Sequence, residues 1–130
     1  MLDFLKSIPG IGVVTALHLL VFFLKFHNAN RKQITALAGL DPIQHQSGRS
    51  VHGKPRISKQ GNSLIRKMLF QATLSAARYN PHIKKHYENL KNSGKPDKVA
   101  RIAAARKLLL LAFSIFKSKR PFTLEYKTVQ

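Results

Sequence analysis

The chain of 130 residues contains no cysteine. This absence excludes disulfides, thiolate zinc sites and cysteine nucleophiles, and it fits a reducing compartment. Carboxylates are almost as scarce, since the five acidic residues are far apart in sequence: Asp3, Asp41, Glu88, Asp97 and Glu125. Two-metal phosphoryl transfer needs several carboxylates that converge on one point. We therefore expect no metal or other cofactor to be bound by this chain alone.

Long hydrophobic runs are also lacking. The longest, residues 13–24, is interrupted by Thr15 and His18, and it is shorter than the roughly 20 residues that span a bilayer. The N-terminus lacks the pattern of a signal peptide. The basic residues are spread over several predicted elements, which makes binding to a membrane surface the weaker alternative. We expect no membrane partner.

Positive charge is what the sequence has in excess. Lysine and arginine number 23, the net charge is +18 and the pI is about 11.0. No acidic residue lies between Asp41 and Glu88, whereas nine basic residues do: Arg49, Lys54, Arg56, Lys59, Arg66, Lys67, Arg78, Lys84 and Lys85. Such a surface predicts a nucleic-acid partner and binding that weakens steeply with salt.

The hydrophobic pattern predicts a mainly α domain over residues 1–120, followed by a tail over 121–130. Helices are expected over residues 2–7, 13–25, 31–38, from 62 or 63 to 79, 81–92 and 97–118. Residues 40–61 lack periodicity, so an irregular central loop is expected there. A short β-hairpin, pairing residues 50–52 with residues 56–58 around Gly53, is possible within that loop.

The N-terminal turn has the pattern of a helix-hairpin-helix motif, carried by Leu5, Ile8, Gly10, Gly12 and Ala16. Main-chain N–H groups of Gly10, Ile11 and Gly12 could hold a backbone phosphate without reading its sequence. The alternative is a plain corner between two helices with glycine caps. Given the basic chain, we favour phosphate binding.

The histidines give a weaker signal. His82 and His86 have the i, i+4 spacing of metal ligands, but Lys84 and Lys85 between them would repel a cation. A solvated helix face is the expected reading. His18 lies within an apolar run and is expected in the core or at its boundary, with its hydrogen bonds satisfied.

Ser47 is the candidate nucleophile. It stands in Gln46-Ser47-Gly48-Arg49-Ser50, where a serine hydroxyl could attack a phosphodiester while arginines stabilise the developing negative charge. From these residues alone, an ordinary loop serine is the simpler interpretation.

A series of motifs resembles the C-terminal domain of the DEDD-type (RuvC-like) insertion-sequence transposases, the bridge-RNA-guided serine recombinases. The first motifs are Ile8-Pro9-Gly10-Ile11-Gly12, Leu37-Ala38-Gly39-Leu40-Asp41-Pro42 and Gln46-Ser47-Gly48. They continue with Ile57-Ser58-Lys59-Gln60-Gly61-Asn62, Ile65-Arg66-Lys67-Met68-Leu69, Asn80-Pro81, Tyr87, Gly94-Lys95-Pro96 and Ala105-Arg106-Lys107-Leu108-Leu109. The resemblance covers about residues 3–117.

The resemblance implies a role in DNA transposition and recombination. It implies that Ser47, with Ser58 as the runner-up, becomes covalently linked to a cut DNA strand. It also implies that a separate RuvC-like domain supplies carboxylates and Mg²⁺, and that guide RNA and a homo-oligomer take part. On this interpretation Arg49, Lys54, Arg56, Ser58, Lys59, Arg66 and Lys67 contact nucleic acid.

The sequence departs from the family pattern in one respect. A RuvC-like domain normally precedes the Ile8-Pro9-Gly10-Ile11-Gly12 motif, and we expect it to be absent here, so that the isolated chain is inactive in strand transfer. A non-catalytic binding module and an inactive remnant of a transposase are the alternatives. The expected location is the bacterial cytoplasm, in association with the nucleoid.

Overall fold

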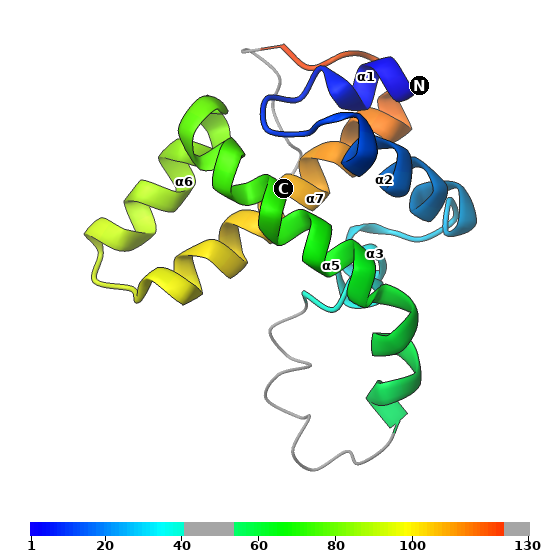
Figure 1. The fold of residues 1–130 in the computed structure, drawn as a ribbon, viewed down its shortest axis with the longest axis horizontal. Helices are drawn as coiled ribbons and strands as arrows, with labels where there is room; N and C mark the ends of the chain where they lie inside the picture. Colours follow the sequence, from blue (N-terminus) through cyan, green and yellow to red (C-terminus); the bar gives the residue numbers. More distant parts are fainter. Residues whose placement is uncertain (41–53, 124–130) are drawn as a thin grey trace.

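The computed structural model describes residues 1–40 and 54–123, and within residues 54–62 it describes the backbone alone. These parts of the chain are mainly α, as predicted, with six helices and no strand (Figure 1). The helices are α1 (Leu2–Lys6), α2 (Val13–Lys25), α3 (Arg31–Leu37), α5 (Lys54–Tyr79), α6 (Pro81–Asn92) and α7 (Asp97–Ser118).

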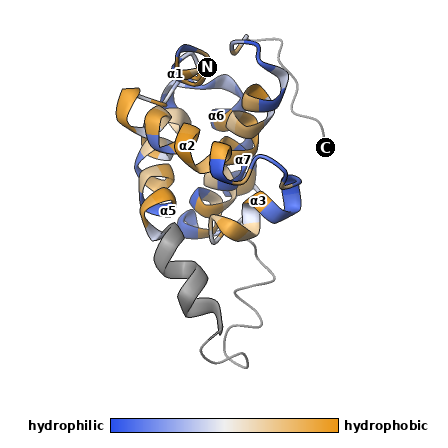
Figure 2. Ribbon diagram, turned by 90° about the vertical axis from the view of Figure 1, so that its right-hand side faces the viewer, coloured by the Kyte–Doolittle hydropathy of each residue, from blue (hydrophilic) through white to orange (hydrophobic). Residues whose placement is uncertain are grey.

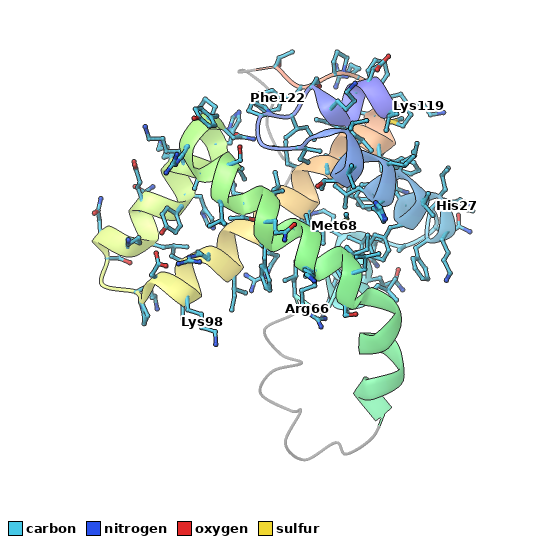
Figure 3. The ribbon with its side chains drawn as sticks, viewed as in Figure 1. His27, Arg66, Met68, Lys98, Lys119 and Phe122 are labelled. Atoms are coloured by element: carbon cyan, nitrogen blue, oxygen red, sulfur yellow. The ribbon has the colours of Figure 1, made fainter. Side chains whose placement is uncertain are left out.

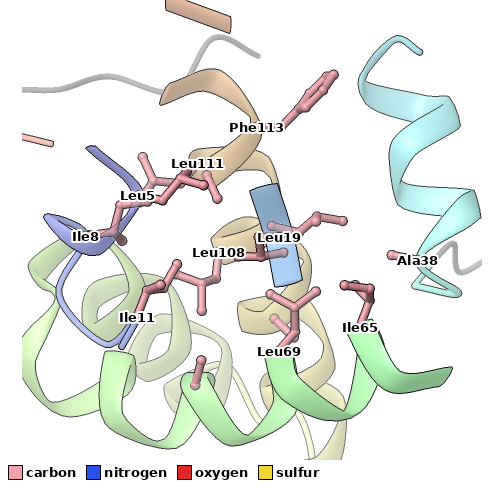
Figure 4. Packing of buried hydrophobic residues seen from close by; sticks show 14 of the residues in the cluster. Leu5, Ile8, Ile11, Leu19, Ala38, Ile65, Leu69, Leu108, Leu111 and Phe113 are labelled. Carbon is pink, nitrogen blue, oxygen red and sulfur yellow. The ribbon is translucent and has the colours of Figure 1, made fainter. Parts of the chain in front are cut away.

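Helix α7 is the centre of the fold, because α1, α2, α3, α5 and α6 all pack against it. Its second half is apolar nearly all round and buried as predicted, through Leu108, Leu109, Leu111, Ala112, Phe113 and Ile115. Figure 4 shows Leu108, Leu111 and Phe113 gathered with Leu5 and Leu19. The rings of Phe23 and Phe113 add an aromatic contact, with centroids 5.2 Å apart.

Local sequence signals set most helix ends. Asn30 accepts a hydrogen bond from the Gln33 N–H at 2.8 Å, and the Gln33 side chain accepts one from the Asn30 N–H, which completes a capping box. Helix α6 begins at Pro81, where proline is tolerated because the first N–H of a helix has no partner. The predicted bounds of α2, α6 and α7 are confirmed.

The start of α5 corrects the sequence-based prediction. The helix begins at Lys54 rather than at residue 62 or 63, so residues 56–58 are helical and cannot form half of a β-hairpin. Pro55 fits the first turn of a helix, and Gly61 is tolerated inside it at a cost of about 1 kcal/mol relative to alanine. The irregular loop predicted over residues 40–61 is therefore wrong for residues 54–61, which are helical. The other half of the proposed hairpin, residues 50–52, lies outside the described residues.

Helix α5 places one face in the core. Ile65, Leu69, Ala72 and Ala76 are buried at the spacing of one helix face, whereas Leu64 is 49% exposed. Lys67 and Arg78 are exposed.

Helix α2 leaves an apolar stripe uncovered. Its exposed residues are Val13, Val14, Leu17, Val21 and Leu24, and the helix is largely orange in the hydropathy view of Figure 2. No charged residue occurs from Val13 to Leu24. Within the described residues, no helix combines the length and the apolar character that crossing a membrane requires.

Candidate nucleic-acid interface

The turn between α1 and α2 is built against the end of α5. Gly10 has a φ of +103°, and a Cβ at this position would lie 2.7 Å from the Cα of Ala76. Ile11 is buried, and its N–H donates to the Ile8 carbonyl oxygen at 3.0 Å. The close backbone approach at Gly10 is therefore made to this protein's own helix. The phosphate-binding role predicted for Gly10 and Ile11 stays a prediction beside this structural role.

Gly12 differs from its neighbours in the turn. It is exposed, it is the N-cap of α2, and a Cβ there would meet no atom within 4 Å. Its φ of −87° suits any residue. Of the three turn residues, Gly12 alone stands at an open helix N-terminus, which is where an anion could approach the main chain.

Asn80 locks this turn to the junction of α5 and α6. Its side chain is fully buried, and its amide nitrogen donates to the Pro9 carbonyl oxygen at 3.2 Å. Its amide oxygen accepts from the N–H groups of His82 and Ile83 and so caps α6. The turn, α5 and α6 are thus held together by one side chain.

The basic residues predicted to contact nucleic acid fall on two parts of the chain. Ser47 and Arg49 lie outside the described residues. Lys54, Arg56, Ser58 and Lys59 occupy the first turns of α5, and Arg66 and Lys67 follow on the same helix. Position 59 is seven residues before position 66, which places both on one face of α5. The predicted cations are therefore carried largely by a helix rather than by a loop.

Arg66 is half-buried, and its guanidinium lies against Gly39 at the end of α3. A Cβ at Gly39 would lie 2.2 Å from Arg66 Nη1, so a larger residue there would displace the end of this side chain. The φ of +76° at Gly39 is the stronger reason for glycine at this position. Arg66 therefore lies beside Gly39, at the junction of α3 and α5.

Helix α7 holds the same junction from the other side. Arg106 donates from Nε to the carbonyl oxygen of Leu40 at 3.0 Å. Leu40 itself is buried. The chain is therefore fixed in the core immediately before residue 41, where the segment that carries Ser47 begins.

Both ion pairs among the described residues use Asp97. Its carboxylate pairs with Arg101 Nη2 at 2.7 Å and with Lys91 Nζ at 3.3 Å, and it accepts a hydrogen bond from the Tyr87 hydroxyl. The Tyr87 hydroxyl first, and the charges of Arg101 and Lys91 with it, lower the pKa of Asp97 to about 2. One carboxylate thus ties α6 to α7, while most of the other cations form no ion pair within the described parts of the chain.

The structure places His18 at the edge of the core, but the solvated face predicted for His82 and His86 is wrong, because both side chains are half-buried. His18 Nδ1 lies 2.9 Å from the Val14 carbonyl oxygen at the edge of the core. His82 packs edge-on against Phe122, with ring centroids 5.7 Å apart. Burial, followed by the charges of Lys107 and Arg106, lowers the pKa of His86. No three acidic or histidine side chains within the described residues are grouped as a metal site requires.

Comparison with known proteins decides the family. A model of the transposase IS116/IS110/IS902 family matches residues 2–88, which is more than half of the chain. The chain belongs to this transposase family. The matched range includes the N-terminal turn, Ser47 and the whole of α5. The predicted resemblance to insertion-sequence transposases is confirmed at the level of this family.

Relatives of the transposase family extend the match beyond residue 88. The pilin gene-inverting protein of Moraxella lacunata is 37% identical over 123 residues, which cover 91% of this chain and 37% of the relative. An uncharacterized 43.6 kDa protein of insertion element IS110 from Streptomyces coelicolor is 28% identical over 116 residues, covering 87% and 28%. The transposase for insertion sequence element IS1111A of Coxiella burnetii is 36% identical over 75 residues, covering 57% and 20%.

The chain spans little more than a third of the length of the pilin gene-inverting protein. No solved structure gives a significant match.

Proposed function

We propose that this chain is the nucleic-acid-binding, serine-bearing part of a transposase and acts in DNA transposition or recombination. The family match over residues 2–88 carries the proposal, because it spans both Ser47 and the basic helix α5. The net charge of +18 supports it independently. DNA is the proposed partner, both as the ends of a mobile element and as its target.

Binding to the DNA backbone would come mainly from the cations of α5. Five cations follow one another along the first half of this helix: Lys54, Arg56, Lys59, Arg66 and Lys67. Each cation that neutralises a phosphate releases a condensed counterion, which is favourable at low salt. Arg49, two residues after Ser47 in sequence, is proposed to contact the DNA as well.

The proposed chemistry starts at the Ser47 hydroxyl. The hydroxyl oxygen attacks the phosphorus of a DNA phosphodiester and forms a new P–O bond. The hydroxyl proton passes to a general base, which can return it to the leaving oxygen. The P–O bond to the neighbouring nucleotide breaks, and that nucleotide leaves with a free hydroxyl group. The strand remains linked to Ser47 as a phosphodiester, and nearby arginines stabilise the negative charge of the transition state. Ser58, in the second turn of α5, is the alternative nucleophile.

The remaining parts of the reaction are proposed to lie outside this chain. The five carboxylates are too few and too scattered for a two-metal site, and Asp97 is already engaged with Lys91 and Arg101. A RuvC-like domain would supply Mg²⁺ and its carboxylate ligands. Guide RNA would use the same basic surface, and the setting would be the bacterial nucleoid.

The test of Ser47 is a covalent-adduct assay. The chain is mixed with a RuvC-like domain from a relative, Mg²⁺ and labelled DNA, and adducts that survive denaturing electrophoresis are counted. We expect an adduct with the unaltered chain and with Ser58→Ala, and none with Ser47→Ala, although Ser47→Ala still binds DNA. An adduct of equal yield with Ser47→Ala would refute the assignment.

A non-catalytic binding module is the second candidate, and the scarcity of carboxylates favours it. It predicts DNA binding with no adduct for any variant. An inactive remnant predicts weak or absent cooperative unfolding. Thermal unfolding and the adduct assay therefore separate all three.

Self-association is proposed through the apolar stripe of α2. The stripe is uncharged over its length, so two copies can meet there without bringing their cations together. Sedimentation should show a dimer that dissociates in Leu17→Asn, while Lys32→Asn, an exposed change on α3, should leave it intact. A monomer at all concentrations would exclude this contact.

A further inference from the structure

A cavity of about 700 Å³ lies where the end of α3 meets α5 and the first turns of α7. Its apolar lining comes from Phe70, Leu74 and Ile102, and its cations are Arg66, Lys98 and Arg101. This volume is in the range of sites that hold one small ligand. Phe70 is 37% exposed, so part of its ring is open to a ligand.

The charge of the cavity favours an anionic ligand. Among the described residues of the lining, Asp97 is the one acidic residue, and Arg101 and Lys91 neutralise it. Arg66 and Lys98 form no ion pair with any carboxylate of the described residues. Figure 3 shows Arg66 on α5 and Lys98 on α7 on the same lower side of the molecule. Two cations from different helices thus line the same cavity.

Arg66 lies beside Gly39 in the folded chain, since a Cβ built at Gly39 would come within 2.2 Å of Arg66 Nη1. The missing side chain at Gly39 leaves this space to the guanidinium, which lines the cavity.

We propose that this cavity binds one unpaired nucleotide of a nucleic-acid strand. The base stacks on the ring of Phe70 among the apolar side chains, and the phosphate is bound by Arg66 and Lys98. The amide of Gln71, also in the lining, has both donors and an acceptor for the edge of a base. This inference rests on the proposed function, which is nucleic-acid binding. It adds that the cavity recognises an unpaired nucleotide.

The nucleotide has to be unpaired for a geometric reason. A base inside a duplex has both faces covered by its neighbours, so it can stack on a side chain only after it leaves the helix. Stacking on an aromatic ring tolerates any base, because every base has a π-face. The cavity would therefore recognise the unpaired state rather than a sequence.

The first test compares two DNA duplexes of the same sequence, one fully paired and one with a single bulged nucleotide. We expect the chain to bind the bulged duplex about tenfold more tightly, which is a typical effect of one stacked base. Phe70→Leu keeps an apolar side chain but removes the ring, and it should abolish this preference. Tyr79→Leu, an exposed aromatic on the same helix outside the cavity, should retain it. Equal binding of both duplexes by the unaltered chain would overturn the proposal.

The contribution of the Lys98 charge to binding is tested by comparing substitutions of two lysines. Lys98→Gln should weaken binding of the bulged duplex more than binding of the paired duplex. Lys95→Gln removes the same charge from an exposed position outside the cavity, and it should affect both duplexes equally. Identical behaviour of the two variants would contradict a phosphate contact at Lys98.

A titration with deoxyadenosine monophosphate separates this inference from the proposed function. NMR signals of Arg66, Phe70 and Ile102 should shift and saturate in the millimolar range, and ribose 5-phosphate, which lacks a base, should bind more weakly. No shift up to about 10 mM would refute the cavity even if the chain binds duplexes. Signal shifts at the cavity without duplex binding would instead support nucleotide binding by the cavity and refute the proposed function.

Repeating the bulge experiment with RNA duplexes identifies the source of the nucleotide. A preference for the bulge in DNA alone assigns the cavity to a DNA strand, and a preference in RNA alone assigns it to RNA. A preference in neither overturns the proposal.

Discussion

Arg106 Nε donates a hydrogen bond to the carbonyl oxygen of Leu40 at 3.0 Å, across 66 positions of sequence. This contact joins the central helix to the last described residue before the segment that carries Ser47. Gly39, one residue earlier, has the guanidinium of Arg66 against it. Arg106 therefore holds the last described residue before the segment that carries Ser47, and Arg66 lies next to it.

Arg106→Ala should lower the stability of the fold. The buried Leu40 carbonyl would lose its charged donor, and hydrogen bonds of this kind contribute about 1.5–3 kcal/mol. We expect a decrease in the free energy of unfolding within that range, measured by urea denaturation. Lys95→Ala, at an exposed position, should change it by less than about 0.5 kcal/mol. If both variants unfold at the same urea concentration, the contact does not stabilise the junction.

Gly10→Ala should be far more destabilising than Gly12→Ala. The added methyl group at position 10 would collide with Ala76, and the φ of +103° is unfavourable for alanine. We expect a loss of about 2 kcal/mol or more at position 10 and less than about 1 kcal/mol at position 12, where the surroundings are open. Thermal unfolding of the two variants measures the difference. Similar losses would contradict the packing of the turn on α5.

Stability at low pH should depend on Asp97. Its pKa is about 2 in the folded chain against an ordinary value of 3.8. Because folding lowers this pKa, the stabilisation is complete above about pH 4 and is lost as the pH falls toward 2. Asp97→Asn should therefore melt below the unaltered chain at pH 7, and the difference should shrink between pH 4 and pH 2.

The control for this pH effect is Glu88→Gln, which removes an exposed carboxylate on α6 that forms no ion pair with the described residues. It should follow the unaltered chain through the acid range. A melting difference for Asp97→Asn that stays constant with pH would show that the Tyr87–Asp97–Arg101 contacts do not stabilise the folded chain.

Much of the helical architecture could be predicted because local signals determine it. Asn30, Asn80 and Pro81 mark helix starts through side-chain caps or a missing N–H, and these signals do not depend on distant residues. The start of α5 was missed because Pro55 and Gly61 act as breakers only in some contexts. Proline is favourable in a first turn, and one glycine does not end a long helix.

The candidate site could be predicted only in part. The basic character of α5 is visible in sequence, since Arg66 and Lys67 are adjacent cations on a helix with one apolar face. The cavity is not visible, because Phe70 and Lys98 meet only through the crossing of α5 and α7. Gly39 marks the end of α3 in the sequence. Its proximity to Arg66 cannot be predicted, because it depends on how α3 packs against α5.

The central claim is that this chain binds nucleic acid through its cations, and a salt series tests it most directly. Affinity for a labelled DNA duplex is measured from about 50 to 200 mM salt, with a structured RNA hairpin in parallel. Five phosphate contacts would give a slope of log K against log salt near −4.5. We predict tight binding at low salt and a slope of about that size. Negligible binding at 50 mM salt, or binding that does not change with salt, would contradict the account.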